Sequence, residues 1–249
     1  MKVSIITPVY NSQDSINETY QSIAGQSHTD WEWLVTDDCS SDLSLNILNE
    51  IAQNDQRVKV LCNSNNSGAA VSRNYALQHV TGEFLAFIDS DDIWLPNKLE
   101  AQLKFMNGDI DFSFTAYELI DASGERLMKT VDTSQKGSFS YNDMLRKKAT
   151  MGCSTVLLRR SSFNDITMPL IRTGQDYALW LKLLKTGKKA HVLNEVLTQY
   201  RILPDSISRN KFKKAKRQWQ IYREIERLGF FESSMNFCFY AYRAVFRKV

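Results

Sequence analysis

Short apolar runs alternate with longer amphipathic stretches through the first part of the chain. The runs have the length and the β-branched or aromatic content of strands, and the stretches between them have the period of helices. The predicted strands are Val3–Ile6, Trp31–Val35, Val58–Leu61 and Phe84–Ile88, and the predicted helices are Ile16–Ala24, Leu43–Ala52 and Ala69–His79. Crossovers of this length join parallel strands and place helices on both faces of a sheet. We therefore expect an α/β fold with a mostly parallel central sheet flanked by helices.

The pattern becomes less regular after Phe105. The cluster Ala122–Gly124 predicts a hairpin, Ser154–Leu158 predicts a strand and Tyr177–Lys185 predicts a helix. With 249 residues, of which 43% are hydrophobic, the chain has enough apolar material for one sizeable core. One main domain with an appended segment is the organisation that this length favours.

Polar clusters directly follow three of the predicted strands. They are Thr7–Asn11, Asp37–Asp42 and Asp89–Asp92. In a parallel sheet the carboxyl ends of neighbouring strands lie at one edge, where ligands gather. The sequence therefore predicts a ligand site assembled from these three turns.

The third cluster places three carboxylates within four positions, at Asp89, Asp91 and Asp92. Like charges raise the cost of ionising one another unless a cation lies among them. If the chain stays extended beyond the strand, Asp89 and Asp91 point the same way, as two oxygen ligands of Mg²⁺ or Mn²⁺ would. A solvated turn, or a cap for a helix that begins near Pro96, is the alternative interpretation of these residues.

The cysteine and histidine content argues against a zinc site or a disulfide framework. The four cysteines are scattered without a CxxC pair, and the three histidines are far apart. The first residues, MKVSIITPVYNS, combine a short apolar run with no small-residue cleavage site, so they fit a first strand better than a secretory signal. A cytoplasmic location is the expectation that follows.

The body and the tail of the chain differ in charge. Residues 209–249 carry eleven Lys and Arg against three Asp and Glu, a net charge of +8, whereas residues 1–208 have a net charge of −5. The basic segment is also rich in aromatic side chains, which suits a membrane surface better than it suits a nucleic-acid-binding arm. Peripheral membrane contact through this tail, with no nucleic acid as partner, is one expectation. A helix that packs its aromatic side chains on the body is the other.

Five short motifs occur in the order and spacing of one enzyme family. They are TPVYN at Thr7–Asn11, TDDCSSD at Thr36–Asp42, NNSGAAVSRNYAL at Asn65–Leu77, TGEFLAFIDSDDIWLP at Thr81–Pro96 and GQDYALWLKLL at Gly174–Leu184. Through them the chain resembles the family 2 glycosyltransferases, inverting enzymes with a GT-A fold that use nucleotide sugars. The resemblance covers about Val3 to Ser208. Together with YRILPDSISRN from Tyr200, it is strongest to bacterial transferases that build surface polysaccharides such as O-antigen and capsule.

The resemblance implies that successive parts of the chain have different functions. Residues 1–105 would form the nucleotide-sugar-binding half and residues 106–208 the acceptor-side half of one GT-A domain, with residues 209–249 as a basic, aromatic helical tail. The nucleotide of a UDP-sugar would be bound by these residues of the first half: Thr7, Pro8, Tyr10, Asp38, Arg73 and Asp89. Within this set Asp38 would contact the uracil base and Asp89 the ribose. A packed Tyr10 and a structural ion pair of Arg73 are the alternatives that the residues alone leave open.

The resemblance also assigns a metal ligand. Asp91 would hold Mn²⁺ or Mg²⁺ on the diphosphate, and we expect Trp94 and Pro96 to close the turn over the sugar. Many relatives have a histidine that can bind the metal at the position of Leu203, and Asp205 lies close to that position. A third protein ligand is therefore not identified. The stretch MGCSTVLLRRSSF resembles a strand and turn at the back of the acceptor cleft, and a plain core strand is the alternative.

Asp176 corresponds to the general base of the family. An acceptor hydroxyl must lose its proton as it attacks the anomeric carbon, and a positioned carboxylate can take that proton. The competing interpretation is that Asp176 only N-caps the helix that follows. Because one base suffices for direct displacement, an inverting hexosyl transfer is expected. The expected acceptor is a saccharide, and an undecaprenyl-diphosphate-linked saccharide suits the basic tail.

Two other function classes remain open from the sequence. A sugar-phosphate nucleotidyltransferase has a similar nucleotide-binding sheet, but its early glycine-rich, basic loop has no counterpart in TPVYNS. A non-catalytic nucleotide-sugar-binding protein would have no need of a base such as Asp176. A metal-dependent inverting glycosyltransferase is therefore the function that the sequence favours.

Overall fold

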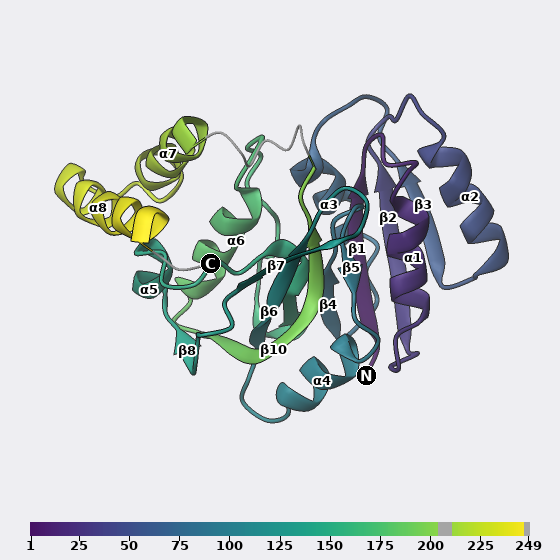
Figure 1. The fold of residues 1–249 in the computed structure, drawn as a ribbon, viewed down its shortest axis with the longest axis horizontal. Helices are drawn as coiled ribbons and strands as arrows, with labels where there is room; N and C mark the ends of the chain where they lie inside the picture. The colour runs from purple at the N-terminus through teal and green to yellow at the C-terminus, as the bar shows by residue number, and fades with distance from the viewer. Residues whose placement is uncertain (204–210, 247–249) are drawn as a thin grey trace.

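The computed structural model describes residues 1–203 and 211–246. In these residues a ten-stranded sheet has helices on both faces, and two helices of the tail lie together at one end (Figure 1). The strands are β1 (Val3–Val9), β2 (Trp31–Asp37), β3 (Val58–Cys62), β4 (Phe84–Phe87), β5 (Ile93–Trp94), β6 (Phe112–Ile120), β7 (Arg126–Val131), β8 (Ser138–Phe139), β9 (Val156–Arg159) and β10 (Ala190–Arg201). The helices are α1 (Ile16–Ala24), α2 (Ser44–Asn54), α3 (Ala69–Leu77), α4 (Lys98–Phe105), α5 (Tyr141–Leu145), α6 (Gln175–Leu184), α7 (Lys211–Gln220) and α8 (Phe230–Phe246).

The strand order divides the sheet into two halves. In the first half, β3-β2-β1-β4, every neighbouring pair is parallel, as the alternation of strands and helices predicts. In the second half, β6 and β10 are parallel, whereas β9 is antiparallel to β4 and to β6. The outer strands β5 and β8 are antiparallel to β10, and β7 is antiparallel to β6. The sheet is thus less parallel than predicted, because a short connection such as the one between β6 and β7 can join only antiparallel strands.

Two hydrophobic cores cover the two faces of the sheet. Helices α1, α2 and α4 pack on one face, to which β1 contributes Val3, Ile5 and Val9. Helices α3, α5 and α6 pack on the other, to which β1 contributes Ile6. This alternation follows from the period of two along a strand. Because β1, β4, β6 and β10 run in the same direction, their carboxyl ends lie at one edge of the sheet.

The predicted elements are largely confirmed, and α1 matches its predicted range residue for residue. The predicted hairpin at Ala122–Gly124 is the link between β6 and β7. The predicted strand at Ser154–Leu158 begins later, because Cys153–Thr155 form a 3-10 turn. Helix α6 begins earlier than predicted, at Gln175, and its N-cap is Gly174 with a φ of 72°. Glycine adopts this left-handed conformation without steric cost, which allows the sharp entry into the helix.

The tail packs on the body through its middle. Helix α7 continues into a π-helical turn, Ile221–Ile225, whose Ile221 and Tyr222 are buried in the core on the α6 face. Tyr222 Oη donates a hydrogen bond to the carbonyl of Leu145. The buried Glu226 carboxylate accepts from Tyr141 Oη and pairs with Lys185, the C-cap of α6. The expected packed helix is confirmed for this part of the tail, whereas the expected boundary between residues 208 and 209 lies outside the described residues.

Candidate active site

The three predicted turns meet at the carboxyl edge of β1, β2 and β4. The Asn11 amide donates to Ser40 Oγ, and the Ser41 amide donates to Asn11 Oδ1, which joins the first turn to the second. Ser12 Oγ and Ser90 Oγ lie 2.8 Å apart and join the first turn to the third. The turns therefore form one continuous surface, as predicted.

The candidate residues of the first turn are placed differently. Thr7 is fully buried, and its Oγ1 accepts a hydrogen bond from Trp33 Nε1 at 2.8 Å. Pro8 is partly buried. Tyr10 is 50% exposed, so it is not the packed aromatic residue of the alternative interpretation. Within this turn the Tyr10 side chain is accessible to a ligand, whereas the Thr7 side chain is packed in the core.

Asp38 uses its carboxylate to shape the turn that precedes α3. Its Oδ1 accepts hydrogen bonds from Asn63 Nδ2 at 2.7 Å and from the Ser67 amide at 2.9 Å, and its Oδ2 accepts from the Gly68 amide at 2.7 Å. Gly68 is the N-cap of α3 and has a φ of 89°, which favours glycine. Asp38 is 3% exposed and thus links the end of β2 to the start of α3.

Arg73 and Asp89 form an ion pair that joins α3 to the turn after β4. The Arg73 side chain is 4% exposed and the Asp89 side chain 29%. The Asp89 amide donates to Ser154 Oγ at 3.0 Å. The structural ion pair that the sequence left open for Arg73 is therefore present, and it leaves part of Asp89 accessible at the edge.

The acidic segment closes into a tight turn. The Asp92 amide donates to the Asp89 carbonyl at 3.2 Å, so the predicted alternation along an extended chain is wrong. Asp92 is fully buried; its Oδ1 accepts from the Arg201 amide at 3.0 Å and its Oδ2 accepts from Ser154 Oγ. Burial raises the pKa of Asp92 well above its usual value, and the charges of Asp91 and Asp89 add to the rise. Asp92 is thus a structural carboxylate that fixes the turn.

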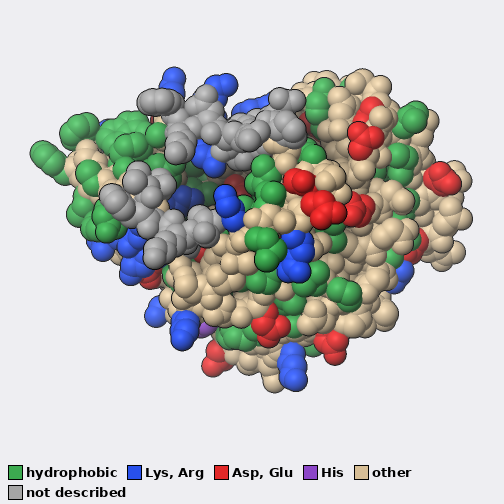
Figure 2. Space-filling model, viewed as in Figure 1, with side chains coloured by type: hydrophobic (Ala, Val, Ile, Leu, Met, Phe, Trp, Pro, Cys, Tyr) green, Lys and Arg blue, Asp and Glu red, His purple; other side chains and the backbone are tan. Residues whose placement is uncertain are grey.

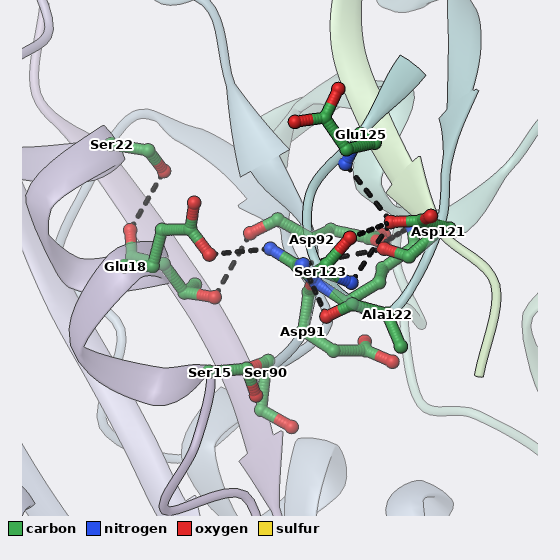
Figure 3. A network of polar contacts seen from close by, with 12 residues as sticks. Ser15, Glu18, Ser22, Ser90, Asp91, Asp92, Asp121, Ala122, Ser123 and Glu125 are labelled. Atoms are coloured by element: carbon green, nitrogen blue, oxygen red, sulfur yellow. Dashed lines mark hydrogen bonds and ion pairs between the residues drawn. The ribbon is translucent and has the colours of Figure 1, made fainter. Parts of the chain in front are cut away.

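Arg201, at the end of β10, holds the same turn from its other side. Its Nε donates to the Asp91 carbonyl at 2.8 Å, its Nη1 donates to the Ala122 carbonyl at 3.1 Å, and its Nη2 pairs with Glu18. Figure 3 shows these partners converging from α1, the acidic turn and the β6–β7 hairpin. Arg201 is 5% exposed, so one buried guanidinium connects four segments of the fold.

The Asp91 carboxylate lies outside this network. Among the residues drawn in Figure 3, no hydrogen bond or ion pair reaches it. Burial raises its pKa to about 6, and the charge of Asp89 contributes to the rise. A bound divalent cation would favour the ionised form and offset this cost.

The donor set fits a cation held partly by the protein. Carboxylate oxygens are the ligands that Mg²⁺ and Mn²⁺ prefer. Over residues 1–203 and 211–246 there is no group of three His, Cys, Asp or Glu side chains placed to hold a metal. Leu203 is 38% exposed and supplies no ligand, and Asp205 lies outside the described residues. Asp91 would therefore share the ion with oxygens of a diphosphate and of water.

Trp94 belongs to the core. It is 2% exposed, and its Nε1 donates to the Ser154 carbonyl at 2.7 Å. The prediction that it closes the turn over the sugar is wrong, because β5 pairs with β10 and turns the indole inward.

Asp176 lies in the first turn of α6 and is partly exposed. Since the N-cap is Gly174, the interpretation of Asp176 as the N-cap does not hold. Burial raises the pKa of Asp176 above its usual value and the charge of Asp89 acts in the same direction, while Arg73 and Lys147 partly oppose the rise. A carboxylate with a raised pKa is a stronger proton acceptor.

The profile of the glycosyl transferase family 2 matches residues 4–167, more than half of the chain. The chain belongs to this family. It is 46% identical to the putative teichuronic acid biosynthesis glycosyltransferase TuaG of Bacillus subtilis strain 168, over 99% of this chain and 97% of TuaG. It is 39% identical to the UDP-Glc:alpha-D-GlcNAc-diphosphoundecaprenol beta-1,3-glucosyltransferase WfgD of Escherichia coli, over 88% of this chain and 84% of WfgD.

The fold of this family 2 glycosyltransferase is also that of a solved structure. The crystal structure of S. aureus TarS residues 1–349 in complex with UDP superposes with a TM-score of 0.73 and 23% identity, over 98% of this chain and 71% of that chain. The GT-A fold implied by the motifs is thereby confirmed. Membership of a glycosyltransferase family also favours this class over the nucleotidyltransferase and the binding protein.

Sequence reasoning missed the residues that position the acidic turn of this family 2 enzyme. Ser154 accepts from the Asp89 amide and donates to Asp92, and Arg201 holds Asp91 and Asp92. Both lie in stretches that the sequence singles out, MGCSTVLLRRSSF and YRILPDSISRN. Their spacing gives no sign of their partners, which are far away in the chain.

The carboxylates of the site differ in what remains available to a substrate. Asp92 is locked by two hydrogen bonds and Asp89 is paired with Arg73. Asp91 and Asp176 keep raised pKa values and partly exposed side chains. The environment of each carboxylate therefore decides whether its side chain can still meet a substrate.

Proposed function

We propose that this family 2 glycosyltransferase moves a sugar from a UDP-sugar to a hydroxyl of a saccharide carried on a lipid diphosphate, with inversion, in the synthesis of a bacterial surface polysaccharide. The observation that carries the proposal is the pair Asp91 and Asp176, two accessible carboxylates whose pKa values are both raised by burial and by Asp89. The names of TuaG and WfgD support the polysaccharide, the donor and the acceptor class.

In the proposed nucleotide pocket some residues would contact the ligand and others would hold the surrounding turns in place. Tyr10 and Asp89 have exposed side-chain surface that a uridine diphosphate can meet. Thr7, Pro8, Asp38 and Arg73 would shape the turns around it. A direct bond from Asp38 to uracil remains a prediction, and it would require one of the present acceptor bonds of Asp38 to be exchanged.

We assign Asp91 as the protein ligand of Mn²⁺ or Mg²⁺. Such an ion neutralises charge on a departing diphosphate. Asp92 and Arg201 hold the Asp91 backbone at the edge of the sheet. Because the protein offers few ligands, we expect tight metal binding only together with the donor.

We assign Asp176 as the general base. The acceptor hydroxyl would give its proton to a carboxylate oxygen of Asp176 while its own oxygen attacks the anomeric carbon. The UDP leaves from the opposite face, so a single displacement inverts that carbon. The Tyr177 amide and the charge of Arg73 lower the pKa of Asp176 and so oppose the rise that burial causes.

A lipid-linked acceptor also implies a location for the enzyme in the cell. We propose a cytoplasmic enzyme in peripheral contact with the membrane through its basic tail. The net charge of +8 in residues 209–249 supports this arrangement. We expect no nucleic acid as a partner.

The test uses the full chain, a panel of UDP-sugars, Mn²⁺ and a short-chain saccharide-diphosphate lipid. Asp176→Asn is expected to lower transfer by about 10²–10⁴-fold and to keep the melting temperature and the affinity for UDP. Asp91→Asn should lower transfer in the same way as EDTA does, because an amide is a poor ligand for a hard cation. Asp109→Asn, at an exposed carboxylate shortly before β6, is the matched control.

The anomeric configuration of the product, read by NMR, tests the stereochemistry. A product that retains the configuration of the donor, or an Asp176→Asn variant that keeps most of its transfer rate, would show that the proposed mechanism is wrong.

A further inference from the structure

Helix α8 buries polar side chains and exposes aromatic ones. Ser233 and Asn236 are 0% and 3% exposed, whereas Phe231 is 89% and Tyr242 is 63% exposed. A helix that faces water normally shows the reverse arrangement. Helix α8 therefore presents large apolar side chains to its surroundings.

The exposed apolar side chains of α8 share one face. At 100° per residue, the positions i, i+4, i+8 and i+11 fall within one quadrant of the helix. The side chains at these positions are Phe231, Met235, Phe239 and Tyr242. We refer to these four as the α8 apolar face. A contiguous exposed patch of this kind marks a contact with a partner or a lipid.

Arg146 and Arg243 lie next to this face, with their guanidinium carbons 5.1 and 5.7 Å from the centre of the Phe239 ring. Figure 2 shows hydrophobic side chains gathered at the α8 end of the molecule, with Lys and Arg around them. The exposed basic residues of α7 and of the segment up to α8 are Lys213, Lys214, Lys216, Arg223 and Arg227. Aromatic groups bordered by Lys and Arg are the composition of helices that lie in the interface of an anionic bilayer.

We propose that the α8 apolar face inserts into the interfacial layer of an anionic membrane while the basic residues beside it meet lipid phosphates. A second copy of the chain is a poorer occupant, because two tails with a net charge of +8 each would repel one another. Of the helices that the structure describes, none is long and apolar enough to cross a bilayer. The contact is therefore one in the plane of the interface.

The position of the tail links this contact to the reaction. Arg217 Nη1 donates to the Thr173 carbonyl at 2.6 Å, close to the start of α6, where Asp176 lies. Ile221 approaches Gly174 so closely that an added Cβ would lie 3.1 Å from its Cδ1. A membrane that holds α8 thus also orients the proposed base. This link rests on the proposed function, whereas the binding of α8 to lipid does not.

The test is vesicle flotation of the full chain. Vesicles of phosphatidylcholine alone are compared with vesicles that also contain phosphatidylglycerol. Phe231→Ser combined with Tyr242→Ser is expected to lower the affinity for the anionic vesicles by about tenfold or more, since each ring loses apolar burial. Met128→Ser, at a side chain of β7 that is also 89% exposed, is the matched control and should bind as the original chain does. Added salt should weaken binding of all three proteins.

Two further measurements separate this proposal from its rivals. The double variant should keep its melting temperature and its transfer to a soluble short-chain acceptor, and lose transfer to the same saccharide on a long-chain lipid in vesicles. Unchanged vesicle binding by the double variant, or a dimer in sedimentation equilibrium that the two substitutions dissociate, would overturn the proposal. Vesicle binding without any transfer by the original chain would instead overturn the proposed function and leave the membrane contact standing.

Discussion

Individual carboxylates at the edge of this sheet owe their roles to their immediate partners. Asp92 is held by Ser154 and Arg201, and Asp89 is held by Arg73. Asp91 keeps its carboxylate outside these bonds, and its pKa is raised to about 6. Hydrogen bonding and burial thus give chemically identical groups different environments, and Asp91 is the one that we propose as a metal ligand.

The pH dependence of transfer follows from the state of Asp176. The proposed base would work only as a carboxylate, and the pKa of Asp176 is raised, mainly by burial. Transfer should therefore fall with decreasing pH through a value above the usual pKa of an aspartate. We predict this acid limb in kcat measured at saturating donor and Mn²⁺, conditions in which a metal bound at the proposed site would keep Asp91 ionised.

Substitutions of Arg73 test this pH dependence further. Because its charge lowers the pKa of Asp176, Arg73→Gln should move the acid limb to higher pH, and Arg73→Lys should move it less. An acid limb at the pH of an ordinary aspartate, unchanged by both substitutions, would contradict the role of Asp176 as a base in this environment.

Single elements of the fold act here as supports for the turn between β4 and β5. The end of β10 carries Arg201, which bonds to Asp91, Asp92, Ala122 and Glu18. The turn is therefore fixed by a strand from the other half of the sheet. Removing this support should affect both the stability of the fold and the position of Asp91.

We predict that Arg201→Met lowers the free energy of unfolding by about 2–4 kcal/mol, since it leaves buried carbonyl acceptors without a donor. Glu18→Gln, which changes only the more exposed partner, should cost less than about 1 kcal/mol. Urea unfolding followed by circular dichroism measures both. Similar losses in the two variants would mean that the ion pair, and not the bonds to the turn, is what Arg201 contributes.

Helix α4 contains a buried amine. Lys98 is fully buried, and its Nζ lies 3.9 Å from the centre of the Trp94 ring, with no hydrogen-bond partner in the described part of the chain. Burial lowers its pKa well below the usual value. The unfolded chain therefore binds this proton more tightly than the folded protein, so stability should rise with pH between the two pKa values.

We predict that Lys98→Met raises the free energy of unfolding at pH 7 by about 1–3 kcal/mol, because it removes an unsatisfied buried group of similar length. It should also reduce the increase in stability between pH 7 and pH 9 in urea unfolding. Lys104→Met, at an exposed lysine of the same helix, is the control. A loss of stability in Lys98→Met would show that the contact with the Trp94 ring outweighs the cost of burial.

The whole molecule includes the tail as part of its core. Ile221 and Tyr222 are buried against residues of α5 and α6, so the tail is not an independent appendage. The outer surface of α8 stays exposed and is free of this packing. Deleting residues 211–249 would therefore expose the core, and substitutions on the surface of α8 give a cleaner test of membrane binding.

We predict that Tyr222→Ala lowers the free energy of unfolding by about 3–5 kcal/mol, as expected for a large aromatic side chain removed from a core. Tyr222→Phe should cost about 1–2 kcal/mol, because it keeps the ring and loses the bond to the Leu145 carbonyl. Tyr242→Ala, at an exposed aromatic residue of α8, should leave stability nearly unchanged. Equal effects at positions 222 and 242, measured by urea unfolding, would mean that the tail does not belong to the cooperative core.

The sequence by itself determined the elements and the family. Hydrophobic periodicity is a local property, so the alternation of strands and helices through Phe87 could be predicted, together with the edge at which the polar turns gather. The five motifs likewise identified the enzyme family, because their order and spacing can be read directly along the chain. The candidate residues Tyr10, Asp89, Asp91 and Asp176 all lie in these motifs and keep accessible surface in the structure.

Only the tertiary structure decided which of these side chains are buried or hydrogen-bonded and which remain accessible to a ligand. Asp92 meets the amide of Arg201, 109 positions further along the chain, because β10 lies beside β5. The same pairing turns Trp94 inward, and the packing of the first turn buries Thr7. On α8 the tertiary structure places aromatic side chains outward and Ser233 inward. The burial and the partners of these side chains depend on which distant segments the topology brings together. The local spacing of residues in the sequence contains no information about these contacts.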